Sequence, residues 1–289
     1  MGGWGAGDSC ENQCAITTLM DLINWSYWYC FPLAVCVCIL ATSSGFSGSV
    51  LFQPVFYFIL KIPLAQSIAT GIATETIGMT WGGLNYAFLN DEKTAIDRKA
   101  IKSSVPYIIG GVLLGIFFFI HAPKPILRFT IGIVIAGIAL YQLWLAGENK
   151  LGGSSQADPK ILSKPLNRIY QIFSGAFSAA TGTGVAEMNQ PLLEERAGLM
   201  TLRANATAIC LEAIADWTIT LANIKLGNIR YDIIIFTVSG VLVGGFIGPR
   251  IAKFLNPRLT KTVFGIAVCS IGFIYMVTSW PSVMKILAS

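Results

Sequence analysis

Charged residues are scarce in this chain of 289 residues. Asp, Glu, Lys and Arg make up 12% of the sequence, hydrophobic residues make up 54%, and the mean hydropathy is +0.65. So few charges cannot cover the surface of a soluble globule, and we expect most of the surface to face lipid. A helix needs about 20 apolar residues to cross the hydrocarbon core of a bilayer, and several apolar stretches approach that length.

Histidine is nearly absent, because His121 is the only one in the sequence. A histidine cluster that binds a metal ion, or a histidine relay that moves protons, is therefore excluded. The sequence also lacks Gly-x-Ser-x-Gly and His-Glu-x-x-His, which mark common hydrolases. We expect no enzyme activity, no cofactor and no metal site.

A basic stripe of the kind that binds nucleic acid is also missing, although the formal net charge is +5. Lys and Arg gather instead in short connections, around residues 93–102, 150–168 and 250–261. The positive-inside rule predicts that these connections are cytoplasmic and that both termini are extracytoplasmic. We expect a multi-pass protein of the cytoplasmic membrane with no nucleic-acid partner.

Ten apolar segments are present, five on each side of a polar stretch, which predicts an all-α polytopic membrane protein. They cover approximately residues 25–42, 50–60, 64–88, 105–120, 126–145, 169–180, 185–193, 204–224, 233–251 and 263–280. We divide the chain into a polar extracytoplasmic N-terminus (1–24), a first membrane repeat (25–146), a cytoplasmic linker (147–165) and a second membrane repeat (166–289). A disulfide that joins Cys10 to Cys14 or Cys30 is left open.

The two halves resemble each other in sequence. Residue pairs that match at a constant shift of 137 positions are Gly45 with Gly182, Gln53-Pro54 with Gln190-Pro191, Ala69-Thr70 with Ala206-Thr207, and Glu75 with Glu212. Matched polar residues inside apolar segments indicate a duplication, and an odd number of segments per half makes the two repeats inverted. Inverted repeats are typical of alternating-access transporters.

Each half contains a glycine-rich break followed by a short helix, near residues 43–49 and 181–184. We predict a broken or re-entrant helix in each repeat, because irregular backbone at membrane depth must be buried in protein or line a cavity. Free N–H groups and the partial positive charge of a helix start favour an anion. Close packing of small residues is the alternative. The candidate substrate-binding residues are Ser47, Ser49, Gln53, Thr183, Asn189, Gln190 and Arg203.

Four carboxyl groups fall within the apolar segments, where a charge costs at least about 2.5 kcal/mol. Glu75 and Glu212 occupy matched positions, and Glu187 lies beside the second break. A carboxyl group that alternates between charged and neutral forms can couple transport to protons, so these three residues are proton-coupling candidates. The alternative is a neutral carboxyl group that forms structural hydrogen bonds. Asp216, one helical turn beyond Glu212, extends a polar stripe on the same face.

These residues resemble the sulfite exporter TauE/SafE family over about residues 31–280. The resemblance lies in Gly45-Phe46-Ser47-Gly48 leading to Pro54, in the Ala69-Thr70 helix, in the Gly110-Gly111 to Gly115 helix, and in their second-half equivalents. It implies movement of sulfite, thiosulfate or organosulfonates such as sulfoacetate across the cytoplasmic membrane, commonly outward. The sequence therefore predicts a secondary transporter of a small sulfur-containing anion, with proton coupling as an option. An anion channel and a membrane-embedded enzyme are the alternatives. The expected partners are the small anionic substrate and the lipid bilayer, and a homodimer is left open.

Overall fold

The computed structural model describes residues 24–89, 91–121, 124–147, 158–182 and 184–287. Within these ranges the chain is all-helical, with ten α-helices, α2 to α11. Their bounds are Cys30–Ser44 (α2), Ser49–Pro54 (α3), Leu64–Phe88 (α4), Arg98–His121 (α5), Lys124–Gly147 (α6), Pro165–Thr181 (α7), Val185–Pro191 (α8), Thr201–Lys225 (α9), Tyr231–Ala252 (α10) and Pro257–Leu287 (α11). Each of the ten predicted segments corresponds to one of these helices.

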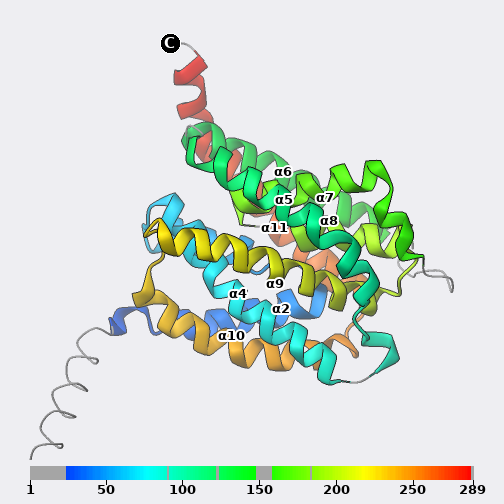
Figure 1. Cartoon of the computed structure of the whole chain (residues 1–289). Helices are drawn as coiled ribbons and strands as arrows, with labels where there is room; N and C mark the ends of the chain where they lie inside the picture. Colours follow the sequence, from blue (N-terminus) through cyan, green and yellow to red (C-terminus); the bar gives the residue numbers. More distant parts are fainter. Residues whose placement is uncertain (1–23, 90, 122–123, 148–157, 183, 288–289) are drawn as a thin grey trace, which may run out of the picture.

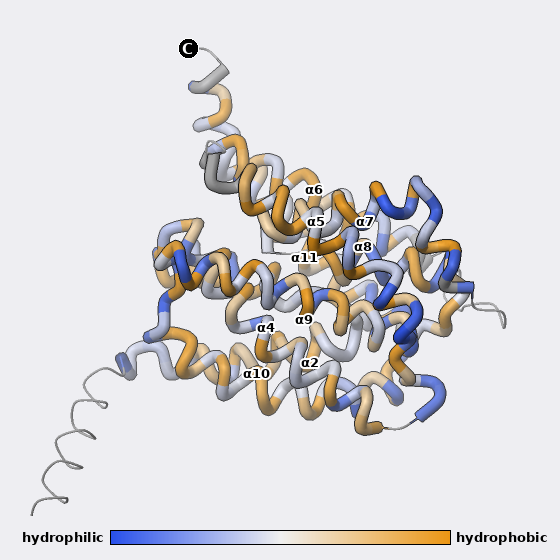
Figure 2. The backbone as a smooth tube through the Cα atoms, in the orientation of Figure 1, coloured by the Kyte–Doolittle hydropathy of each residue, from blue (hydrophilic) through white to orange (hydrophobic). Residues whose placement is uncertain are grey.

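The helices lie side by side, with polar residues gathered mainly at their ends (Figures 1 and 2). Six stretches are long and apolar enough to cross a membrane: Trp25–Ser44, Glu92–Phe118, Pro125–Trp144, Thr201–Lys225, Tyr231–Ala252 and Arg258–Lys285. Large apolar side chains face outward, including Phe118, which is 65% exposed, and Phe273, which is 62% exposed. Lipid is the solvent in which such a surface is stable, so the chain is a multi-pass membrane protein.

The long helices α4 and α9, of 25 residues each, pack against one another at the centre of the molecule. α10 packs against α2 and α4, α5 packs against α7 and α9, and α6 packs against α11. Hydroxyl groups join the two central helices, because Thr76 Oγ1 lies 2.7 Å from Thr220 Oγ1. Polar side chains are thus present in the interior and not only at the helix ends.

Each of the short helices α3 and α8 follows a glycine whose backbone is in the left-handed conformation. α2 ends at Gly45, whose φ is 77°, and α7 ends at Gly182, whose φ is 75°. Only glycine adopts this conformation without strain, and it commonly ends a helix. A methyl group on Gly182 would also overlap the amide nitrogen of Gln53. The breaks therefore lie where the sequence predicts them.

The short helices widen after a proline. α3 ends at Pro54 and continues as a π-helical turn over Val55–Ile59, and α8 ends at Pro191 and continues as a π-helical turn over Leu192–Arg196. Proline lacks an N–H group and clashes with the carbonyl group four residues earlier, so it weakens the regular hydrogen-bond pattern around it. Together α3 and its turn span 11 residues, about 16 Å at 1.5 Å per residue, or half of a bilayer core.

The basic connections meet at one end of the bundle. Lys253, after α10, binds Asp91, before α5, with Nζ 2.9 Å from Oδ2. Arg203, near the start of α9, binds Asp97 in the same region with Nη2 3.1 Å from Oδ2. The Asp91 carboxyl group is exposed, and its hydrogen bond to Lys253 lowers its pKa from the usual value. The connection before α5 therefore meets the end of α10 and the start of α9 at one face.

Residues 1–23 and 148–157 lie outside the described residues, and the predicted N-terminal region and linker stay predictions. The same applies to Cys10 and Cys14. Cys30 is buried and forms no disulfide with another described cysteine.

We expect Gly111→Ala to destabilise the packing of α5 on α7, because the added methyl group would overlap the backbone carbonyl of Ile172. Overpacking of this kind costs about 1–3 kcal/mol. The matched control is Gly110→Ala, because a methyl group there meets no atom within 4 Å. The readout is the temperature at which half of the detergent-purified protein disappears from its size-exclusion peak. Equal midpoints for the two variants would contradict the prediction.

Candidate functional site: buried carboxylates at the helix breaks

At the first break, Glu75 of α4 caps the start of α3. Glu75 Oε1 accepts a hydrogen bond from Gly48 N at 2.6 Å, and Oε2 accepts from Ser49 N at 2.9 Å and from Ser47 Oγ at 2.7 Å. The first N–H groups of a helix have no partner within the helix, and a carboxylate complements their partial positive charge. Glu75 thus accepts hydrogen bonds from the N–H groups that we expected, from the sequence, to bind a substrate anion.

The second break is bound in the same manner by Glu212 on α9. Glu212 Oε2 accepts a hydrogen bond from Ala186 N at the start of α8, and Oε1 accepts from Ser178 Oγ at 3.3 Å. Ala186 lies 137 residues after Ser49, the same shift that relates Glu212 to Glu75. Each central helix therefore supplies the carboxylate that caps the short helix preceding it in the chain.

Glu187 connects the two breaks. Its Oε1 accepts a hydrogen bond from Ser47 N at 2.7 Å, and its Oε2 accepts from Gly184 N at 3.0 Å. The side chain belongs to the first turn of α8, so it also complements the start of its own helix. The prediction from sequence that Glu187 lies beside the second break is confirmed, and the structure adds the contact with the first break.

Asp216 is the fourth carboxyl group and the one that sequence analysis did not include among the site residues. It is fully buried on α9, and neither of its carboxyl oxygens has a hydrogen-bond partner in the described part of the chain. Carboxyl oxygens of Glu75, Glu212 and Asp216 all lie within 4.8 Å of one another. We call these three residues the carboxylate cluster. The signal in the sequence was the spacing of four residues between Glu212 and Asp216.

Positive charge is scarce around the carboxylate cluster. Among the described residues Lys261 is the one buried Lys or Arg, and its Nζ lies 3.0 Å from Oε2 of Glu194. A buried carboxylate that loses water without a counter-charge costs several kcal/mol. Hydrogen bonds from N–H and hydroxyl groups offset part of that cost at Glu75, Glu187 and Glu212. The described residues therefore place several carboxyl groups together without a nearby counter-charge, which a proton or a cation can supply.

The two matched glutamines bind the opposite half of the chain. Gln53 Nε2 donates to the carbonyl oxygen of Thr181 at the end of α7, and Gln190 Nε2 donates to the carbonyl oxygen of Ser44 at the end of α2, at 3.3 Å. Carbonyl groups at a helix end have no partner within the helix, so these amides satisfy them. Both Oε1 atoms are buried without a partner in the described residues.

The remaining candidates lie in different places. Ser49 Oγ is 3.0 Å from Ser47 Oγ, inside the first break. Asn189 Nδ2 donates to Ser174 Oγ at 3.1 Å and to the carbonyl oxygen of Val185 at 2.8 Å. Thr183 lies outside the described residues.

Arg203 is not at the breaks. It lies nine residues before Glu212 on α9, about 13 Å along the helix axis, and pairs with Asp97. A substrate contact for Arg203 therefore stays a prediction that its position in the structure does not support.

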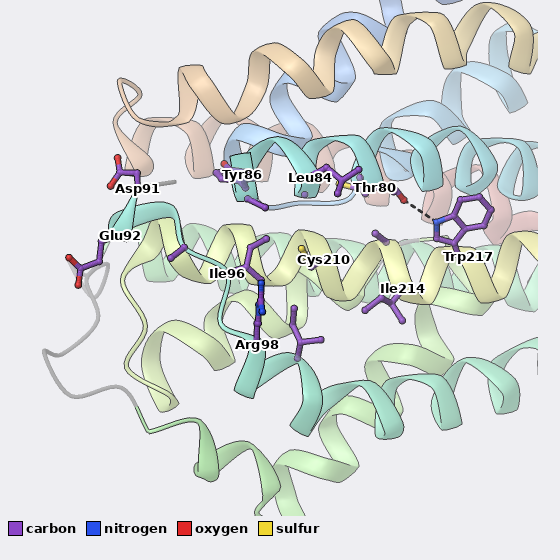
Figure 3. A pocket seen from close by; sticks show the side chains of 16 residues that line it. Thr80, Leu84, Tyr86, Asp91, Glu92, Ile96, Arg98, Cys210, Ile214 and Trp217 are labelled. Atoms are coloured by element: carbon purple, nitrogen blue, oxygen red, sulfur yellow. Dashed lines mark hydrogen bonds between the residues drawn. The ribbon is translucent and has the colours of Figure 1, made fainter. Parts of the chain in front are cut away.

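A groove of about 790 Å³ runs between α4 and α9 (Figure 3). Asp91 and Glu92 lie at one end of it, Arg98 lies farther along near Ile96, and Trp217 lies at the other end with its Nε1 donating to Thr80 Oγ1 at 3.0 Å. Met79 lines both this groove and a cavity of about 10 Å³ that Glu75 and Gly48 also line. The groove and this cavity therefore share Met79 as a lining residue.

A second cavity, of about 820 Å³, reaches the other break. Glu187 lines it together with residues of α6 and α7, and Arg196, Tyr170 and Asn167 supply polar groups. Arg196 Nη1 donates to Asn167 Oδ1 at 2.6 Å, and Tyr170 donates to the carbonyl oxygen of Met188 at 3.0 Å. The break region is therefore flanked by cavities from two directions.

The fold and site define a multi-pass α-helical membrane protein with two helix starts in its interior and buried carboxylates bound to them. Comparison with known proteins gives the family: the sulfite exporter TauE/SafE family matches residues 30–275, and the chain belongs to it. This is a family of transporters. No curated protein and no solved structure matched the chain.

We expect Lys261→Met to destabilise the protein by about 3–5 kcal/mol, because it leaves Glu194 buried without its partner. Adding Glu194→Leu to that variant should restore most of the loss. Lys253→Met is the control, since its pair with Asp91 is partly exposed and such pairs contribute about 0–1 kcal/mol. Thermal unfolding of the four purified proteins checks this. A double variant as unstable as Lys261→Met would disprove the account.

We expect Gln53→Ala and Gln190→Ala each to lower stability by roughly 1–3 kcal/mol, because each leaves a buried carbonyl group at a helix end without its donor. Both variants should still fold and should bind substrate more weakly. Gln66→Ala, a half-buried position on α4, is the matched control. Thermal unfolding and substrate-binding titrations measure the two effects. Unchanged affinity in both variants would remove the amides from the binding site.

Proposed function

We propose that this protein is a secondary transporter that exports a small sulfur-containing anion across the cytoplasmic membrane. The candidate substrates are sulfite, thiosulfate and organosulfonates such as sulfoacetate. Membership in the TauE/SafE family supports the transport of such anions. The observation that carries the proposal is that two helices begin in the interior and that their first N–H groups donate to carboxylate oxygens. Sulfite and sulfonate oxygens are acceptors of the same kind.

The two halves are, in this proposal, inverted repeats that rock around the breaks. Reciprocal contacts support it: Gln53 binds the end of α7 and Gln190 binds the end of α2, while Glu75 and Glu212 cap the starts of α3 and α8. The residues in each pair are 137 positions apart. Inverted repeats that meet at broken helices are a common basis of alternating access.

The substrate would bind at the breaks, where Ser47 and Ser49 supply hydroxyl groups and Asn189, Gln53 and Gln190 supply amides. Thr183, in the second break, is a further candidate. The N–H donors are bound by Glu75 and Glu212, so the substrate anion competes with these carboxylates. Neutralising a glutamate weakens the competing acceptor and removes the like charge. Anion binding is thereby linked to the uptake of positive charge, and a proton is the simplest carrier of it.

Both cavities beside the breaks are candidate approaches for the anion. The groove between α4 and α9 opens at the basic face, where Arg98 would attract an anion. Since Lys and Arg favour the cytoplasmic side, that face would be cytoplasmic and the groove would lead inward toward Met79. Movement of Met79 would connect the groove with the first break.

Transport is tested in proteoliposomes loaded with labelled sulfite, thiosulfate or sulfoacetate. A secondary transporter should show saturable efflux and counterflow, in which unlabelled substrate outside accelerates the exit of label. Flux that rises linearly with concentration and shows no counterflow would indicate an anion channel. If none of the three anions moved, the proposed substrate class would be wrong.

We expect Glu75→Gln and Glu212→Gln to alter the pH dependence of this flux, because an amide cannot exchange a proton. Asp232→Asn is the control, as Asp232 lies outside the breaks and lines neither cavity. The measurement is the initial rate of anion efflux across a series of pH values for the wild type and the three variants. A wild-type pH profile in both buried variants would leave these glutamates with a structural role alone.

A further inference from the structure

Asp216 is a buried acidic side chain that the protein itself does not satisfy. It is fully buried on α9, and both carboxyl oxygens are without a hydrogen-bond partner among the described residues. An unpaired buried carboxylate is one of the most costly groups a protein can contain. A group in this position calls for a ligand that supplies positive charge.

The neighbours of Asp216 are arranged as ligands of the same kind. One carboxyl oxygen each from Glu75, Glu212 and Asp216 can be chosen so that all three lie within 4.8 Å of one another. Two oxygens bound to one cation at 2.3–2.6 Å are separated by at most about 5 Å, so any two of these three oxygens are close enough to share an ion. Oxygen-only ligands select hard cations and disfavour zinc and copper.

Both glutamates accept hydrogen bonds at the breaks. Glu75 accepts three hydrogen bonds and Glu212 accepts two, all from N–H or hydroxyl groups at the breaks. Such contacts favour the ionised carboxylate. The lone pairs not used in these bonds are free to face Asp216. The two glutamates can therefore cap the short helices and bind a cation simultaneously.

We propose that Glu75, Glu212 and Asp216 form a binding site for a hard metal cation of the size of Na⁺ or Ca²⁺. This revises the expectation from sequence of no metal site, which considered histidine clusters alone. The inference does not depend on the proposed transport activity, although a cation there would neutralise the region into which an anion must move.

A shared proton is the competing explanation for the same geometry. The other titratable groups near the carboxylate cluster are Glu187 on α8, which binds both breaks, and the Cys38 thiol on α2, which lines the cavity next to Glu75. Neither supplies positive charge. Binding measurements at one fixed pH therefore separate a metal cation from a proton.

The test is direct binding of ²²Na⁺ and ⁴⁵Ca²⁺ to the full-length protein in detergent, by scintillation proximity, at constant pH and ionic strength with choline chloride as the balancing salt. We expect saturable binding of one of the two ions, displaced by the same unlabelled ion and not by choline. Asp216→Asn should weaken it at least tenfold, because even indirect partners of metal ligands change affinity by about 10–100-fold.

Two controls keep the result interpretable. Asp232→Asn removes an acidic group outside the carboxylate cluster, which pairs with Arg230, and should bind the ion like the wild type. Glu212→Gln provides a second variant of the cluster if Asp216→Asn does not fold. A wild type that binds neither ion above the choline background, or binding that Asp216→Asn and Glu212→Gln leave unchanged, overturns the proposal.

Anion efflux from the same preparation distinguishes the two proposals. Efflux without cation binding would refute the metal site and leave the transport function standing. Cation binding without efflux of sulfite, thiosulfate or sulfoacetate would refute the transport function and leave the metal site standing.

Discussion

Two helices of this protein begin in its interior, and the need to satisfy their first N–H groups governs the structure around them. In lipid no water can bind these groups, so the protein supplies Glu75 to α3 and Glu212 to α8. The capping residues come from α4 and α9, the two helices that pack against each other at the centre. The capping contacts therefore fix the short helices, the breaks and the central pair relative to one another.

Satisfying the N–H groups with carboxylates creates a second requirement. Glu75, Glu187, Glu212 and Asp216 are buried together, and the one buried Lys or Arg among the described residues, Lys261, is paired with Glu194. The local charge balance must come from outside the protein chain, as protons or as a cation. This requirement gives a physical reason why the binding of an anion at the breaks should be linked to the binding of positive charge.

Several hydrogen bonds that join the two halves lie at the breaks. Gln53 and Gln190 each bind the end of a helix in the opposite half, and Glu187 binds both breaks. A change of shape that moves one half against the other must keep or exchange these few hydrogen bonds. Because the cavities of about 790 and 820 Å³ lie beside them, the breaks are positioned between two candidate approaches.

The sequence by itself determined the class of protein, the ten helices and the positions of the breaks. These features depend on local chemistry: apolar length sets the helices, Gly45 and Gly182 end two of them, and Pro54 and Pro191 widen the turns that follow. The candidate glutamates were also visible, because a carboxyl group inside an apolar segment is costly wherever the segment packs. The family followed from the order of these motifs and is shown by the match over residues 30–275.

Only the tertiary structure decided what those residues contact. From the sequence, the N–H groups at the breaks were candidates for binding a substrate, whereas in the structure they donate to Glu75 and Glu212. Arg203 pairs with Asp97, and Asp216 lies beside the two glutamates. The position of Asp216 beside Glu75 depends on how α4 and α9 pack, and the contact of Arg203 with Asp97 joins residues 106 positions apart. A hydrophobic pattern specifies which face of a helix is buried, whereas the partner at that face depends on packing across the whole bundle.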